Sequence, residues 1–162
     1  MNVSFSIWMR LAVAAACIFL AGILQNTNAL LVVQVKPNLV LALLAVFAFF
    51  ISDWIGYLIL IFISGLTLRF QGGLDIGAAA VTVTAILIFA LRNKFPGARF
   101  VDAMLAVVVG TLAFYAIAHI SLFRSDPLTI FIEMVYNSIV GAGAYLIASQ
   151  FLVYEKGFRT SR

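Results

Sequence analysis

The residues of this chain that are best suited to chemistry lie in its last apolar stretch, which combines a carboxylic acid, an amide and a glycine. Glu133, Asn137 and Gly141 follow one another at a spacing of four, so a helix places them on one face. An ionisable side chain inside a membrane is costly and indicates a partner or a transport pathway. An amide in hydrocarbon also needs a hydrogen-bond partner on a neighbouring helix. These residues predict a packing face within the chain or an association face for another protein.

Glu133 has three possible environments. It lies about six residues below the expected outer end of its helix, roughly 9 Å at 1.5 Å per residue. His119 lies at a similar depth near the end of the preceding apolar run, so the two side chains can form an internal pair. Alternatively, Glu133 reaches up to water, or it contacts a partner protein or a ligand.

Other reactive groups are few, since the chain has one His, one Cys and six acidic residues. His119, Ser121 and Asp126 have the residue types of a catalytic triad, but nothing indicates an oxyanion hole. The sequence has no metal-ligand spacing, no phosphate-binding loop and no basic run interleaved with aromatic residues. The single Cys17 permits no intramolecular disulfide. We expect neither an enzyme nor a cofactor, a metal or a nucleic-acid partner.

The composition requires lipid as the main solvent. Hydrophobic residues make up 65% of the chain and charged residues 10%, and the mean hydropathy is +1.17. A soluble domain has about a quarter of its residues charged. The sequence therefore predicts an integral membrane protein that lies in the lipid bilayer.

The apolar runs predict an all-α fold in a single transmembrane domain, residues 1–162. About six transmembrane helices in three hairpins are expected at 7–24, 38–52, 54–69, 76–91, 101–123 and 128–154. The second and third runs are shorter than a full span, so they are tilted or one of them is re-entrant. Runs such as "NLVLALLAVFAFFI" are apolar on every face, which is not the alternation of a β-barrel.

The basic residues predict the orientation. Cytoplasmic loops carry an excess of Lys and Arg. With the N-terminus inside, the inner side receives seven basic residues and the outer side three, Lys36, Arg69 and Arg124. The inner seven are Arg10, Arg92, Lys94, Arg99, Lys156, Arg159 and Arg162. Both termini are therefore expected in the cytoplasm.

Turn residues separate the runs. Pro37 suits a first helical turn at the start of the second run, with Asn38 beside it. The segment "GGLDIG", which begins with Gly72 and Gly73 and ends at Gly77, is expected to form a tight turn, because glycine allows positive φ.

The stretch "KPNLVLALLAVFAF…GYLILIFISGLTLRFQGGLDIGA", Lys36–Ala78, resembles the middle of the MreD family of rod shape-determining membrane proteins. The shared pattern is a basic residue, Pro and Asn that open a helix, followed by a helix that ends in a glycine, here Gly65, and a glycine turn. Asn137 matches a further position of the family. Two departures are Arg69, where the family commonly has Asp, and Ala142 or its neighbours, where a Pro is frequent.

This resemblance implies a non-enzymatic scaffold subunit of the complex that elongates the bacterial cell wall. Such a protein lies in the bacterial inner membrane with several passes, binds the bitopic protein MreC and other cell-wall elongation proteins, and helps to couple cytoskeletal MreB to peptidoglycan synthesis. The expected fold is similar to that of the substrate-binding subunits of energy-coupling-factor vitamin importers.

An importer subunit is the alternative function. It requires a ligand cavity open to the outside, lined by groups such as Glu133, His119, Asn137 and the loop Arg69–Asp75, and small residues such as those of Gly77–Ala85 for a coupling subunit. A different kind of small membrane protein is the third possibility.

Overall fold

The computed structural model describes residues 7–27, 35–68, 76–95 and 97–151 of the chain. The regular elements in these ranges are helices, which confirms the predicted all-α fold. They are α1 (Ile7–Asn26), α2 (Leu39–Phe47), α3 (Trp54–Leu68), α4 (Ile76–Leu91), the 3₁₀ turn η2 (Arg92–Lys94), α5 (Arg99–Ala118), α6 (Leu122–Ser125) and α7 (Pro127–Phe151).

Four segments of the described ranges are long and apolar enough to cross a membrane: Trp8–Asn26, Ile76–Lys94, Arg99–Ala118 and Pro127–Gln150. Helix α3 has 15 residues and α2 has nine, so both are shorter than a perpendicular span. Every long helix exposes large apolar side chains, as expected of a surface in contact with lipid. Examples are Leu20, Ile55, Phe62, Leu87, Ile117 and Leu146.

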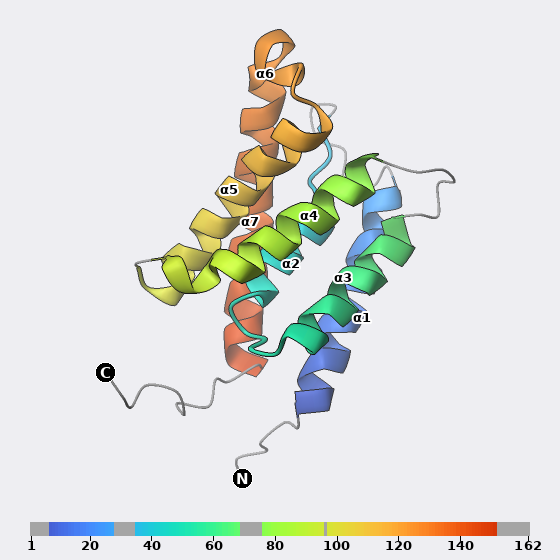
Figure 1. The fold of residues 1–162 in the computed structure, drawn as a ribbon, viewed down its shortest axis with the longest axis vertical. Helices are drawn as coiled ribbons and strands as arrows, with labels where there is room; N and C mark the ends of the chain where they lie inside the picture. Colours follow the sequence, from blue (N-terminus) through green and yellow to red (C-terminus); the bar gives the residue numbers. More distant parts are fainter. Residues whose placement is uncertain (1–6, 28–34, 69–75, 96, 152–162) are drawn as a thin grey trace.

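Helix α2 lies in the middle of the bundle (Figure 1), and eight of its nine residues are buried. It packs against α1, α4, α5 and α7. Its sequence, LVLALLAVF, carries no polar side chain and is apolar all round, which is the pattern of a buried helix. The hydrophobic core is therefore built around a helix that is too short to cross the bilayer.

Two helices are shorter than the apolar runs that predicted them. The second was expected at 38–52, but α2 ends at Phe47 and a turn follows over residues 48–50. The fifth was expected at 101–123, but α5 ends at Ala118, where the C-cap residue His119 has φ −146° and ψ 50°. The apolar residues after both ends continue the hydropathy signal without continuing the helix.

The start of α7 is fixed by two adjacent residues. Pro127 takes the first helical position, where its missing N–H costs nothing. Asp126 precedes it and accepts hydrogen bonds from the N–H of Thr129 at 3.2 Å and from its hydroxyl at 2.6 Å. These bonds lower the pKa of the Asp126 carboxyl below its usual value. Asp126 thus serves as an N-cap.

Helix direction alternates along the chain from α1 to α5, and α7 runs back beside α5. Figure 1 shows the beginning of α1 and the lower end of α7 at the same end of the bundle, with α6 at the opposite end. The arrangement places Arg10, Arg92 and Arg99 toward the first end and Arg124 at the other.

Arg92 completes the lower end of α2. Its guanidinium donates to the carbonyl of Ala48 at 2.7 Å, to that of Ser52 at 2.9 Å and to that of Ile51. It also lies 3.7 Å from the ring centroid of Phe89. The last carbonyls of a helix have no partner within the helix, and lipid supplies none. A side chain from another segment therefore satisfies the carbonyl groups that follow α2.

Candidate functional site

The first turn of α2 is satisfied by side chains from other helices. The N–H of Asn38 donates to Asn137 Oδ1 at 2.8 Å, and the N–H of Val40 donates to Gln25 Oε1 at 3.1 Å. Asn38 itself caps the helix, because its Oδ1 accepts from the N–H of Leu41 at 3.1 Å. Three backbone donors that have no helical acceptor are thus bound by α1, α7 and the N-cap.

Asn137 is the centre of this arrangement and has no solvent exposure. Its Oδ1 accepts from the N–H of Asn38, and its Nδ2 donates to Thr111 Oγ1 at 3.0 Å and to Glu133 Oε1 at 3.4 Å. It joins α7 to α5 and to the start of α2. We call the connected side chains Gln25, Asn38, Thr111, Tyr115, Glu133 and Asn137 the polar network.

Glu133 is buried within this network, with 6% of its surface exposed. Its Oε2 accepts a hydrogen bond from the hydroxyl of Tyr115 on α5, and its Oε1 accepts from Asn137. Both carboxyl oxygens are therefore bound within the chain. Of the environments considered for Glu133, an internal contact is the one observed, but the partner is Tyr115 and not His119.

His119 lies outside the polar network. It follows the last residue of α5, it is exposed, and its ring centroid lies 6.2 Å from those of Phe114 and Tyr115. Asp126, which shares this end of the bundle, accepts from Thr129 as described above. Asp126 therefore acts as a helix cap at this end of the bundle.

Gly141 is buried on the same face of α7 as Glu133 and Asn137. A Cβ atom there would lie 3.0 Å from Val107 Cγ2 on α5. The absence of a side chain thus permits the close contact of α5 and α7. All three residues of the predicted face point into the chain's own bundle.

The predicted turn residues have different places. Pro37 is buried but precedes the N-cap Asn38, so it stands before the helix and not in its first turn as expected. Gly65 lies within α3, where an added Cβ meets nothing within 4 Å, and Gly77 is the second residue of α4. Gly72 and Gly73 lie outside the described residues.

Four residues of this architecture were not singled out from the sequence: Gln25, Thr111, Tyr115 and Arg92. Thr111 and Tyr115 are spaced by four on α5, so they share a face, and this spacing was a signal that sequence reasoning could have used. Gln25 directly follows the first predicted span, 7–24, and its neighbours indicate no contact with α2. Arg92 is one of the seven basic residues predicted on the inner side, and nothing near it in the sequence indicates a contact with the end of α2.

Within the described ranges, no group of three or more His, Cys, Asp and Glu side chains is arranged to hold a metal ion. The polar network therefore has the chemistry of helix-to-helix hydrogen bonding: amide, hydroxyl and carboxyl groups bind one another and the backbone. It holds a short helix among longer ones.

No family model, curated protein or solved structure matches this chain. Its class follows from its own features. Four helices suited to a membrane, an apolar surface and a buried hydrogen-bonded polar network define a helical membrane protein built around a short central helix.

Proposed function

We propose that this protein is a non-enzymatic scaffold of a bacterial cell-wall elongation complex, as the resemblance to MreD implies. In this proposal it lies in the inner membrane with both termini in the cytoplasm and binds the single transmembrane helix of an MreC-like partner. The observation that carries the proposal is an apolar groove between α5 and α7.

The groove has a volume of about 480 Å³ and lies on the outer side of the two helices. It is lined by Phe100, Met104 and Val108 of α5 and by Met134, Val135, Ser138, Ile139 and Ala142 of α7. Ser138 and Ala142 are small residues four positions apart, the spacing that lets transmembrane helices approach closely. The Ser138 hydroxyl donates to the carbonyl of Met134 at 2.7 Å, so the groove is effectively apolar.

The chemistry of the groove selects its occupant. Its position midway along α7 places it within the hydrocarbon, where an occupant must satisfy its own backbone hydrogen bonds. An apolar helix meets this requirement. The Glu133, Asn137 and Gly141 face is filled by the chain's own α5 and α2, so a partner helix has to bind another surface of α7, and the groove is such a surface.

The distribution of basic residues supports the proposed orientation. Arg10, Arg92, Lys94 and Arg99 belong to segments in the half of the bundle where α1 begins, whereas Arg124 lies in α6 at the other end. An excess of basic residues is typical of the cytoplasmic side.

The test of the orientation is cysteine labelling with a membrane-impermeant reagent after Cys17→Ala. Arg124→Cys is expected to react in intact cells, and Lys94→Cys is not. Labelling of Lys94→Cys from outside would refute the orientation.

The partner site is tested by filling the groove. Ala142→Leu adds volume between Ser138 and the groove wall, so a tagged protein should lose its single-span partner on purification in mild detergent. The matched control is Ala90→Leu, which makes the same change at an exposed position of α4. Both variants should accumulate to the wild-type level.

Gly141→Leu separates partner binding from folding. Its side chain would collide with Val107 inside the bundle, so the protein's own level in the membrane should fall.

Retention of the single-span partner by Ala142→Leu would refute the groove as the binding surface. If instead an ATPase-containing complex and a vitamin-sized solute co-purify, the importer function would replace the scaffold.

A further inference from the structure

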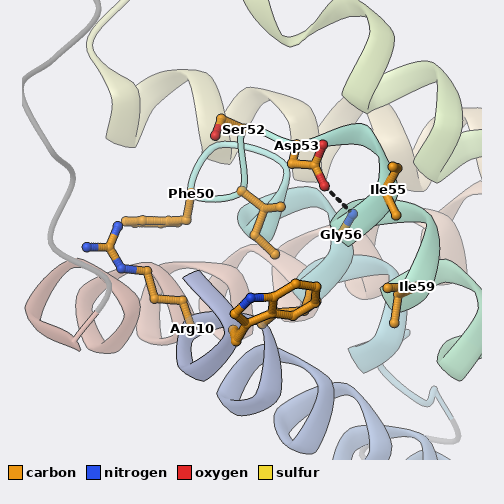
Figure 2. A pocket seen from close by; sticks show the side chains of 10 residues that line it. Arg10, Phe50, Ser52, Asp53, Ile55, Gly56 and Ile59 are labelled. Atoms are coloured by element: carbon orange, nitrogen blue, oxygen red, sulfur yellow. Dashed lines mark hydrogen bonds between the residues drawn. The ribbon is translucent and has the colours of Figure 1, made fainter. Parts of the chain in front are cut away.

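A second pocket lies at the end of the bundle where α1 begins. Its volume is about 150 Å³, and it is bounded by the first turn of α1, the segment after α2 and the first turns of α3 (Figure 2). A cavity of this volume is large enough for a benzene-sized group. Its lining combines apolar side chains with the charged residues Arg10 and Asp53.

The two charged groups lie on different sides of the pocket and do not neutralise each other (Figure 2). The Nε of Arg10 is buried and has no hydrogen-bond partner among the described residues. Asp53 Oδ2 accepts from the N–H of Gly56 at 2.8 Å and caps α3. A carboxylate can accept several hydrogen bonds, so Asp53 retains capacity for a further donor.

The unpartnered Nε–H of Arg10 requires an acceptor, and phosphate, like carboxylate, matches the donor geometry of arginine. On the opposite side of the pocket, the Asp53 carboxylate can accept a hydrogen bond from a cation that carries N–H groups. The pocket therefore has a positive group on one side and a negative group on the other (Figure 2).

The remaining wall indicates an amphiphile. Trp8 is 73% exposed at the start of α1, and tryptophan is enriched where hydrocarbon meets the headgroups. Ile55 and Ile59 continue from the pocket along the outer surface of α3, and they are 70% and 38% exposed. These side chains offer a path for an acyl chain that leaves the pocket toward the hydrocarbon.

We propose that this pocket binds an aminophospholipid, with the lipid phosphate at Arg10, the primary ammonium group at Asp53 and an acyl chain along Ile55 and Ile59. A lipid with a quaternary ammonium group has no N–H to donate to Asp53. A lipid with a glycerol headgroup has no cation there.

The test is native mass spectrometry of the whole protein after equal additions of phosphatidylethanolamine, phosphatidylcholine or phosphatidylglycerol. The wild-type protein is expected to retain phosphatidylethanolamine in preference to the other two. Arg10→Gln should lower its retention about tenfold, because a hydrogen bond to a charged group is lost. Asp53→Asn keeps the cap of α3, since Asn is an equally good N-cap, but should abolish the preference for ethanolamine over choline.

Arg124→Gln is the matched control, because it removes an exposed arginine at the opposite end and should leave retention unchanged. Arg10→Lys keeps the charge without the fork of donors and should bind at an intermediate level, which separates a loss of phosphate binding from a loss of folding. Equal retention of the three lipids by the wild-type protein, or wild-type retention by Arg10→Gln, would overturn the proposal.

Discussion

Replacing Asn137 by leucine removes the centre of the polar network while keeping a side chain of similar size. The N–H of Asn38, now 2.8 Å from Asn137 Oδ1, loses its acceptor at a buried position, and the 3.0 Å bond to Thr111 is lost as well. Hydrogen bonds between membrane helices contribute about 0.6 kcal/mol on average and up to about 1.7. A buried donor without an acceptor costs about 1–3 kcal/mol. We expect Asn137→Leu to lower the free energy of unfolding by about 2–3 kcal/mol.

The assay is reversible unfolding of purified protein in mixed micelles, with an increasing fraction of a denaturing detergent. Thr111→Val is the comparison, because it removes one acceptor of Asn137 and leaves the bond to Asn38 in place; a loss of about 0.6–1 kcal/mol is expected. A free energy of unfolding of Asn137→Leu within about 0.5 kcal/mol of the wild-type value would contradict the role of Asn137 at the start of α2. A larger loss for Thr111→Val than for Asn137→Leu would contradict it as well.

Three further predictions concern a helix contact and two helix ends. A Cβ on Gly22 would lie 2.3 Å from the Thr67 hydroxyl, whereas one on Gly143 meets nothing within 4 Å; Gly22→Ala should lower the thermal midpoint and Gly143→Ala should keep or raise it, and a fall of equal size in both would contradict this. Arg92→Met leaves the carbonyls after α2 without a donor and should destabilise the protein by about 2 kcal/mol in the same unfolding assay, with Arg92→Lys recovering only part of the loss. Because the pKa of Asp126 is lowered from 3.8, the stability that its carboxylate contributes is fully present above pH 3.8. This stability is lost as the pH falls through the lower pKa of the folded state. Between about pH 5 and pH 2, the thermal midpoint should fall more in the wild type than in Asp126→Asn, and parallel curves would argue against the cap.

The helical class and most helix boundaries could be predicted, because a run of apolar residues long enough to cross a membrane ends where polar residues begin. The ends of α2 and α5 could not. Residues such as Ile51 and Phe123 continue the apolar runs, but the helices have already ended. Nothing local in the sequence indicates that Arg92 would bind the carbonyl of Ala48, which lies 44 positions earlier.

The candidate site could likewise be predicted only in part. The spacing of Glu133, Asn137 and Gly141 placed them on one face, and the structure finds them on one face. Which partner each of them has depends on how α5 packs on α7. Tyr115 reaches Glu133 from the helix, whereas His119 lies beyond the point where α5 ends. The spacing of Thr111 and Tyr115 places their hydroxyls on one face of α5, but it does not show that this face packs on Glu133 and Asn137 of α7.

The capped central helix has a consequence for the order in which the protein is made. Asn38 and Asn137 are 99 positions apart, so a ribosome that adds about 5–20 residues per second needs about 5–20 s to deliver the second after the first. During that interval the N–H of Asn38 has no acceptor from α7. The carbonyls after the other end of α2 likewise have no donor until Arg92 has been synthesised. A nine-residue helix cannot wait in lipid as an independent span. The start of α2, the second helix of the chain, therefore gains this acceptor only after α7, the last helix described, has been synthesised.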